Sequence, residues 1–209
     1  MDVHPGLFDR LDLPDSIGAL VQQWNICRKC RMQGTPVPYW GPADCDVLVV
    51  GMFPGKKEDK DRVLFSNKAG EYCRGWMNSI VMNRGTIGYT NVMACCPPYT
   101  GMSFQYKKEH MDACSPWLDK LIFLMNPKVI IGLGRLPLQR FTSIADPKID
   151  TQRGIKRNYK GYPFIPMTHP AQMQQFRDKK RRRAFEERLL EDMHAVRAII
   201  MDIFTEKPL

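Results

Sequence analysis

Four short apolar runs predict the strands of a sheet. They cover residues 46–50, 89–93, 128–133 and 164–167, and each is rich in β-branched or aromatic residues and bounded by Gly, Pro or Asn. Because the runs are almost continuously apolar, they indicate strands that are buried on both faces, as the strands of a parallel sheet are.

Helical patterns lie between and after these runs. Residues 72–83 predict one helix, Ser115 and Pro116 resemble an N-cap and a first-turn proline for a second helix that reaches residue 125, and a third begins near Pro137. Apolar positions at helical spacing predict a terminal helix with one buried face: Phe185, Leu189, Met193, Val196 and Ile200. This alternation indicates an α/β fold with a mainly parallel sheet covered on both sides, and such folds bind ligands beyond the carboxyl ends of their strands.

Length and composition favour one domain. The chain has 209 residues, of which 44% are hydrophobic, enough for one sizeable core. We expect a partly helical N-terminal extension at 1–24 and a single domain at 25–209. No run approaches the roughly 18 apolar residues of a membrane span, and residues 1–5 lack the basic start and apolar stretch of a signal peptide. We therefore expect a cytoplasmic monomer with no membrane partner.

The charge of the chain indicates a polyanionic partner. Lys and Arg total 31 against 22 Asp and Glu, a formal charge of +9, which makes nucleic acid the leading partner. Five consecutive cations open the predicted terminal helix: Lys179, Lys180, Arg181, Arg182 and Arg183. The helix dipole disfavours positive charge there, so phosphate binding explains this run better than helix stability does.

The cysteines predict a metal site. Cys27 and Cys30 are separated by two residues, while Cys95 lies at a strand end and Cys114 lies just before a predicted helix. The fold can therefore gather four thiolates, a set of ligands that suits zinc or an iron–sulfur cluster. Cys96 is an alternative to Cys95. Two further cysteines have apolar neighbours and are predicted to be core residues: Cys45 and Cys73.

A series of short motifs extends from residue 27 to the terminal helix. It comprises Cys27-x-x-Cys30, Gly41, Gly51-x-x-Pro54-Gly55-x-x-Glu58-Asp59, Phe65 with Ala69-Gly70, Thr90-Asn91-Val92-x-x-Cys95-x-Pro97-Pro98, Glu109 with Cys114, Pro127-Lys128-Val129-Ile130, Leu133-Gly134, Arg153-Gly154 and Pro166-x-x-His169-Pro170. In this order and near this spacing, the motifs resemble those of the iron–sulfur uracil-DNA glycosylases, known as family four. The resemblance implies a three-layer α/β sandwich with a four-stranded parallel sheet, clamped by a four-cysteine [4Fe-4S] cluster, with zinc as the less favoured occupant. It also implies hydrolysis of the N-glycosidic bond of a uracil or modified pyrimidine flipped out of DNA, which leaves an abasic site.

The resemblance assigns roles to three residues at strand ends or in nearby loops. It implies that Phe65 stacks on the flipped base and that the carboxamide of Asn91, which carries both a donor and an acceptor, reads the pyrimidine edge. It implies that His169 binds the base carbonyl oxygen as negative charge builds on the leaving base. A positioned donor at that point provides electrostatic stabilisation of the transition state.

The first motif departs from the family. Met52 stands where family four has a glutamate, and Phe53 stands where related families have an aspartate or asparagine. The polar group expected to position the attacking water is therefore missing, and Met52 and Phe53 are predicted to form part of the base pocket. Glu58 and Asp59 are the nearby carboxylates and are the predicted catalytic replacements. The alternative is a dissociative route that needs only stabilisation of the leaving base.

Two further segments are predicted to contact DNA. The tight turn of Gly51, Pro54 and Gly55 carries little side chain, which lets the backbone approach sugar or phosphate. In the superfamily that the chain resembles, the segment after the last strand wedges into the DNA duplex. The resemblance therefore implies that Met173 or Gln174 fills the space that the flipped base leaves in the stack.

Two alternative functions stay open from the sequence alone. One is a glycosylase specific for a hypermodified base, of the kind an antiviral defence would require, with little activity on uracil. The other is a DNA-binding member of the superfamily without catalysis. Met52 and Phe53 favour both alternatives. Phe65, Asn91 and His169 argue against the non-catalytic one, because a pure phosphate binder needs none of them.

Overall fold

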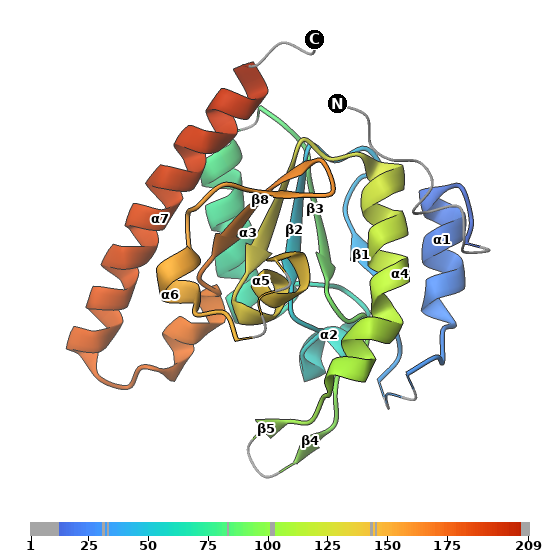
Figure 1. Cartoon of the computed structure of the whole chain (residues 1–209). Helices are drawn as coiled ribbons and strands as arrows, with labels where there is room; N and C mark the ends of the chain where they lie inside the picture. The colour runs from blue at the N-terminus through green and yellow to red at the C-terminus, as the bar shows by residue number, and fades with distance from the viewer. Residues whose placement is uncertain are drawn as a thin grey trace.

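A central sheet with helices on both faces forms the body of the molecule (Figure 1). This computed structural model describes residues 13–30, 32, 34–82, 84–100, 103–142, 144 and 146–205. The first half contains α1 (Ile17–Asn25), β1 (Tyr39–Trp40), β2 (Val47–Gly51), α2 (Lys56–Asp61), α3 (Lys68–Val81), β3 (Ile87–Asn91), β4 (Tyr99–Thr100) and β5 (Ser103–Phe104). The second half contains α4 (Lys108–Met125), β6 (Val129–Leu133), α5 (Arg135–Thr142), α6 (Ile149–Gln152), β7 (Arg157–Tyr159), β8 (Tyr162–Met167), the 3₁₀ helix η2 (Pro170–Gln175) and α7 (Lys179–Thr205).

The sheet has the strand order β1-β3-β2-β6-β8-β7. Its four inner strands are parallel and are the four strands predicted, so the α/β class and the mainly parallel sheet are confirmed. The expected number of strands is wrong, because β1 and β7 add antiparallel edges and make a six-stranded sheet. These edge strands have two and three residues, which is too short for a recognisable apolar pattern.

The register brings the strand ends to one edge of the sheet. Gly51 at the end of β2 is opposite Asn91 at the end of β3, and Leu133 at the end of β6 is opposite Met167 at the end of β8. The loops that leave these four strands therefore start side by side, where the sequence places its candidate site residues.

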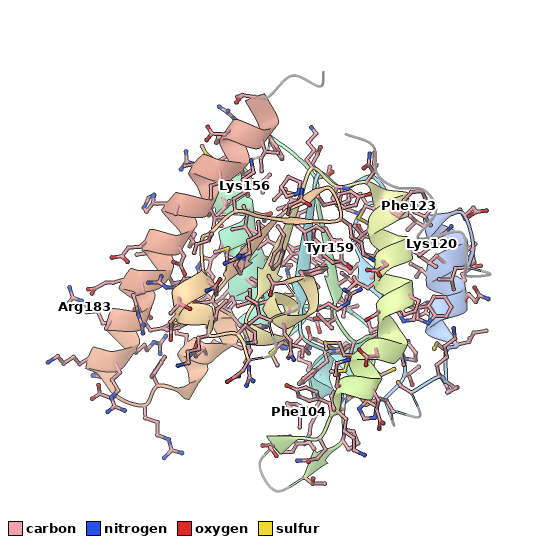
Figure 2. All side chains as sticks on the ribbon, in the orientation of Figure 1. Phe104, Lys120, Phe123, Lys156, Tyr159 and Arg183 are labelled. Atoms are coloured by element: carbon pink, nitrogen blue, oxygen red, sulfur yellow. The ribbon has the colours of Figure 1, made fainter. Side chains whose placement is uncertain are left out.

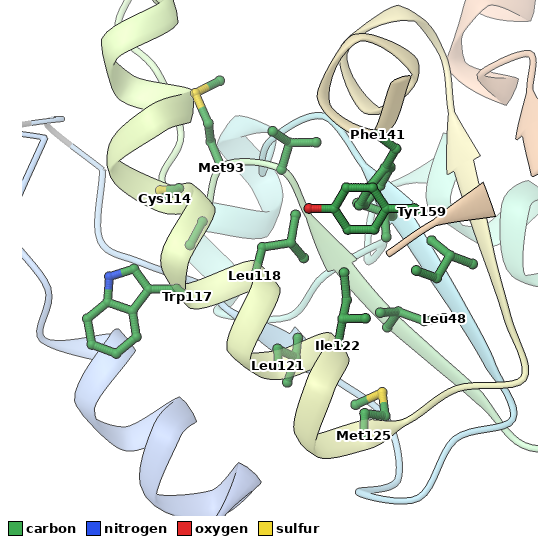
Figure 3. Close-up of a cluster of buried hydrophobic side chains, with 14 of the residues drawn as sticks. Leu48, Met93, Cys114, Trp117, Leu118, Leu121, Ile122, Met125, Phe141 and Tyr159 are labelled. Carbon is green, nitrogen blue, oxygen red and sulfur yellow. The ribbon is translucent and has the colours of Figure 1, made fainter. Parts of the chain in front are cut away.

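Alternate residues of β2 divide the core into two layers. Leu48 and Val50 belong to the layer shared with α4 and α5, where Leu118 and Ile122 of α4 are directed towards Leu48 (Figure 3). Val47, with its alternate neighbour Val49, belongs to the layer shared with α3 and α7. Both faces of the parallel sheet are thus covered, as its apolar sequence requires.

The terminal helix buries the predicted apolar face, its second half in the layer that covers the sheet and its first half against η2. Phe185, Leu189, Val196 and Ile200 are buried, and Met193 is partly buried. No helix within the described ranges is long and apolar enough to cross a bilayer.

Helix α4 begins at Lys108, eight residues before the predicted first helical residue, so the prediction from Ser115 and Pro116 is wrong. Pro116 lies inside the helix, where it cannot donate to the carbonyl of Asp112 and costs roughly 3 kcal/mol. The Ser115 hydroxyl donates to the carbonyl of Met111 (2.9 Å) instead of capping a helix. Burial of the apolar α4 side chains against the sheet and α1 outweighs the proline penalty.

Helix α1 lies in the predicted N-terminal extension and packs against α4. Leu20 and Trp24 are buried in the core, and Trp24 stacks on Trp117 with ring centroids 5.9 Å apart. The described part of the extension is therefore helical and packed on the domain, whereas its residues 1–12 lie outside the described ranges.

Candidate active site

A cavity of about 510 Å³ opens at the carboxyl edge of the sheet. This volume lies within the range of roughly 300–1,000 Å³ that is usual for ligand pockets. Its wall contains all the predicted base-binding residues and three of the four predicted catalytic ones, Asn91 belonging to both sets: Met52, Phe53, Phe65, Asn91, Glu58 and His169. Residues separated by more than 100 positions in the sequence are thus brought to one pocket.

Asn91 ends β3 and offers a buried amide to the cavity. Its side chain is only 3% exposed, and its Nδ2 atom has no hydrogen-bond partner among the described residues. A Cβ at the neighbouring Gly51 would lie 2.3 Å from Asn91 Oδ1, so glycine is needed for this close approach. An unpaired buried donor costs about 1–3 kcal/mol, a cost that a ligand with a matching acceptor would remove.

His169 is half-buried in the cavity wall and has a defined tautomer. Its Nδ1 accepts a hydrogen bond from the backbone N–H of Ala171 (3.1 Å), which leaves Nε2 to carry the ring proton. Desolvation lowers the pKa of His169 to about 4, so the ring is neutral near pH 7. Gly134 has a φ of 88°, and a Cβ there would come within 3.3 Å of His169 Cβ. Glycine at this position therefore leaves room for the histidine.

Phe65 is held in a left-handed backbone conformation, with φ 56°. Its N–H donates to Glu58, its carbonyl accepts from Arg74, and its ring lies 5.0 Å from the ring of Tyr89. A Cβ at Gly70 would collide with the Phe65 carbonyl oxygen at 2.2 Å. Such conformations of bulky residues cost about 1–3 kcal/mol and persist only when their surroundings determine them, often at functional sites.

Glu58 connects the two loops that carry the first motif and Phe65. Its Oε2 accepts from the N–H of Gly55 (2.6 Å) and from Asn67 Nδ2 (3.1 Å), and its Oε1 accepts from the N–H of Phe65. Burial raises the pKa of Glu58, and the hydrogen bonds from the two backbone amides oppose that shift. The bridge joins Glu58 to donors within nine positions of it, but it depends on how the loop bends back and not on a periodic pattern, so the sequence did not indicate it.

Asp59 is not brought to this site. It is absent from the described wall of the cavity, and its Oδ1 accepts from the N–H of Thr35 (3.1 Å) on a different loop. Of the two predicted catalytic carboxylates, only Glu58 reaches the pocket.

Met52 and Phe53 both lie in the cavity wall, as predicted. Phe53 packs against two aromatic residues that follow β3, with ring centroids 5.0 Å from Phe104 and 5.3 Å from Tyr106. The sequence did not predict the β4–β5 hairpin that carries Phe104. Phe53, at the position where related families have a polar group, therefore packs against this hairpin.

Arg135 is a wall residue that the sequence reasoning missed. It follows Gly134 at the end of β6 and makes an ion pair with Asp146 (2.5 Å). Its place directly after a parallel strand is the signal that would have identified it, because loops at that edge form the ligand sites of such sheets.

The predicted DNA-binding residues fall into two groups. Gly51, Pro54 and Gly55 lie beside the cavity, and the cations of residues 179–183 are exposed on the first turns of α7. Met173, in contrast, is 6% exposed and packs with Phe185 in an apolar cluster beside α7. That packing disfavours the predicted wedge role of Met173, and the side chain of Gln174 lies outside the described set.

The predicted metal ligands Cys30, Cys95 and Cys114 have shifted pKa values, and each shift has another of the predicted ligands among its causes. A hydrogen bond from Cys114 lowers the pKa of Cys30 to about 5, and burial together with the charges of Cys30 and Cys27 raises the pKa of Cys95 to about 12. In the described part of the chain, no three His, Cys, Asp or Glu side chains converge closely enough to form a metal site without adjustment. Cys96 faces the carbonyl of Pro97 instead (3.6 Å).

Cys45 and Cys73 lie apart from this group. Both are buried, and each belongs to one of the two apolar layers. Their predicted role as core residues is confirmed.

Comparison with known proteins shows the family of the chain. The model of the uracil DNA glycosylase superfamily matches residues 38–193. A type-4 uracil-DNA glycosylase of Sulfurisphaera tokodaii is 31% identical over 125 residues, which cover 58% of this chain and 56% of that protein. The type-4 uracil-DNA glycosylase of Archaeoglobus fulgidus is 28% identical, over 75% of this chain and 82% of that protein. The type-4 uracil-DNA glycosylase of Thermotoga maritima is 26% identical, over 93% of this chain and 98% of that protein. The chain therefore belongs to the uracil DNA glycosylase superfamily, and its curated relatives are of type 4.

Proposed function

We propose that the protein is a uracil-DNA glycosylase, which hydrolyses the N-glycosidic bond of a uracil flipped out of DNA and leaves an abasic site. The observation that carries this proposal is the buried, unpaired Nδ2 donor of Asn91 in the cavity wall. In uracil, the carbonyl at position 4 would accept from Nδ2 while the ring N3–H donates to Oδ1. In that arrangement, cytosine would instead present its amino group to the Nδ2 donor.

The other wall residues support the chemistry of bond cleavage. Phe65 provides an aromatic ring for stacking, and the Nε2–H of His169 donates to the base carbonyl at position 2. As the bond between the sugar C1′ and the base N1 breaks, its electron pair moves to the base, and the neutral histidine stabilises the resulting anion. Water then adds to the sugar cation at C1′ and releases its proton to solvent.

Glu58 supports this route by position rather than by direct attack. Its carboxylate is occupied by three donors that fix the loops of Gly55 and Phe65. With apolar side chains at Met52 and Phe53, the pocket favours a dissociative route in which stabilisation of the leaving base dominates. The exposed cations of α7 and the overall charge of +9 provide contacts for DNA phosphates.

We include a [4Fe-4S] cluster held by Cys27, Cys30, Cys95 and Cys114 in the proposal. Four soft thiolates suit iron–sulfur ligation, and the mutual influence of these thiols on their pKa values supports their proximity. Such a cluster would link the loop after α1, the loop after β3 and helix α4, and it would contribute to folding rather than to the reaction. We expect the protein to act in the cytoplasm, where these thiols stay reduced.

The test is release of base from oligonucleotides that differ only in carrying uracil, thymine or cytosine at one position, read by alkaline cleavage of the abasic site. We expect cleavage of the uracil oligonucleotide alone. Asn91→Leu should slow this release by at least tenfold because the base edge loses its partner. Its melting temperature should be equal or higher, because an unsatisfied buried donor is removed.

Asn78→Leu, on the exposed surface of α3, is the matched control and should release uracil at the wild-type rate. Failure of the wild-type protein to release uracil, or a normal rate in Asn91→Leu, would contradict the proposal.

A further inference from the structure

The β4–β5 hairpin projects from the body of the molecule near the cavity (Figures 1 and 2). It is short, with only Tyr99 opposite Phe104 and Thr100 opposite Ser103, and the N–H of Gln105 closes its base on the carbonyl of Pro98 (2.8 Å). A two-stranded hairpin is marginally stable on its own, so the contacts to the body determine its position.

Aromatic rings form a continuous path from the cavity to the outer face of this hairpin. Phe53 and Phe104 line the cavity and meet edge to face, with centroids 5.0 Å apart. Phe104 meets Tyr99 in the same way, again at 5.0 Å. Tyr99 is 44% exposed, so much of its ring is open to solvent. The hairpin thus places an accessible ring directly behind a residue of the pocket wall.

A positive charge accompanies this ring. The ammonium of Lys56, an exposed residue at the start of α2, lies 4.1 Å from the centroid of the Tyr99 ring. Lys56 follows Gly55, whose backbone borders the cavity. An exposed aromatic face with an adjacent cation is the combination with which proteins bind the bases and phosphates of single-stranded nucleic acid.

We propose that Tyr99 and Lys56 form a stacking site for an unpaired nucleotide that neighbours the flipped one on the same DNA strand. The inference rests on the proposed function, because the occupant is the strand whose target base fills the cavity. Tyr99 would stack on the neighbouring base, Lys56 would contact a phosphate, and Phe53 and Phe104 would support the ring from behind. The aromatic residue at position 53 thereby gains a role in binding DNA beside the pocket.

The experiment uses single-stranded oligonucleotides that contain one uracil and one 2-aminopurine, placed one or two positions to either side of the uracil. Stacking on an aromatic ring quenches 2-aminopurine fluorescence. Binding is measured with full-length His169→Ala protein, in which we expect slow base release, and with the same protein carrying Tyr99→Leu, Tyr99→Phe or Lys56→Gln.

We expect quenching at one or two of these positions. Tyr99→Leu should abolish it and weaken binding by about tenfold or more, since stacking on an aromatic residue contributes about 1–3 kcal/mol per base. Tyr99→Phe retains the ring and should retain the quenching. Lys56→Gln should weaken binding less and lower the slope of its salt dependence by about one unit, as expected for a single phosphate.

Two results would overturn the inference. One is quenching that the Tyr99→Leu substitution leaves unchanged. The other is the absence of quenching at every position, which is expected if the hairpin contacts another protein instead of DNA. Because fluorescence requires no catalysis, these results are separate from failure of the proposed function, which is absence of uracil release by the wild-type protein. Unchanged melting temperature of Tyr99→Leu would show that the effect does not arise from unfolding.

Discussion

At the scale of single residues, His169 allows the sharpest prediction. If its Nε2–H stabilises the leaving base, His169→Ala should slow uracil release by about a hundredfold or more, the usual effect of removing a donor to developing negative charge. Single-turnover kinetics would measure this rate. His194→Ala, which changes an exposed histidine of α7, is the control and should leave the rate unchanged.

The pKa of His169 extends this prediction to pH. Desolvation lowers it from 6.5 to about 4, so the ring stays neutral from pH 6 to 8 and base release should show no step near pH 6.5. The unfolded chain binds the proton more readily than the folded one. The free energy of unfolding should therefore fall as the pH is lowered from 6.5 towards 4. His169→Ala should flatten this fall, and an unchanged slope in chemical denaturation at these pH values would contradict the assignment.

Sequence reasoning identified the residues that line the cavity better than those that hold them in place. Asn91 lies near the end of one predicted strand and His169 follows another, and the rule that parallel strands place their loops at one edge was enough to bring them together. The support of Phe65 by Glu58 and Arg74 was not predicted, because it depends on hydrogen bonds to backbone atoms of a left-handed residue. Nothing in the types of these residues indicates that conformation.

At the scale of elements, the basic start of α7 permits a test with an internal control. Arg182 and Arg183 each pair with a glutamate four residues later, at 3.0 and 3.1 Å, and the preceding residues 179–181 are exposed cations. Replacing residues 179–181 by Ala should flatten the dependence of log Kd on log salt by roughly two to three units, about one for each phosphate that these cations neutralise.

The double variant Arg182→Gln with Glu186→Gln removes an ion pair without changing net charge, so its slope should stay close to that of the wild type. Uracil preference should be equal in both variants, since phosphate contacts carry no base specificity. A slope that residues 179–181 do not influence would mean that this turn faces solvent in the complex.

The elements that sequence reasoning missed share a physical cause. β1, β4, β5 and β7 have two or three residues each, so they carry no periodicity, and tertiary contacts such as the ring of Phe53 hold them in place. Pro116 indicated a helix start because its ring usually excludes it from helix interiors. In α4, burial of a long apolar face outweighs this preference of proline for the first turn of a helix. That burial depends on tertiary packing, which the local sequence does not show.

At the scale of the whole molecule, the four cysteines come from the N-terminal segment, the loop after β3 and helix α4. If they hold an iron–sulfur cluster, protein purified without oxygen should be brown, with broad absorption near about 400 nm from charge transfer between thiolate and iron. Removal of the iron by a chelator should lower the melting temperature, because the free energy of binding contributes to folding. Colourless protein with stoichiometric zinc would refute the assignment of the metal.

The choice of the third ligand can be tested with two neighbouring cysteines that are almost equally buried. Cys95 and Cys96 are 6% and 7% exposed. The charge of Asp59 acts on both thiols, but those of Cys30 and Cys27 act on Cys95, whereas those of Lys56 and Glu58 act on Cys96. Cys95→Ser should therefore lose the colour, the iron and much of the thermal stability. Cys96→Ser should retain all three, because it makes the same chemical change at similar depth without removing a ligand. Iron content per chain, measured alongside the melting temperature, separates loss of the cluster from general destabilisation, and retention of iron by Cys95→Ser with loss in Cys96→Ser would reverse the assignment.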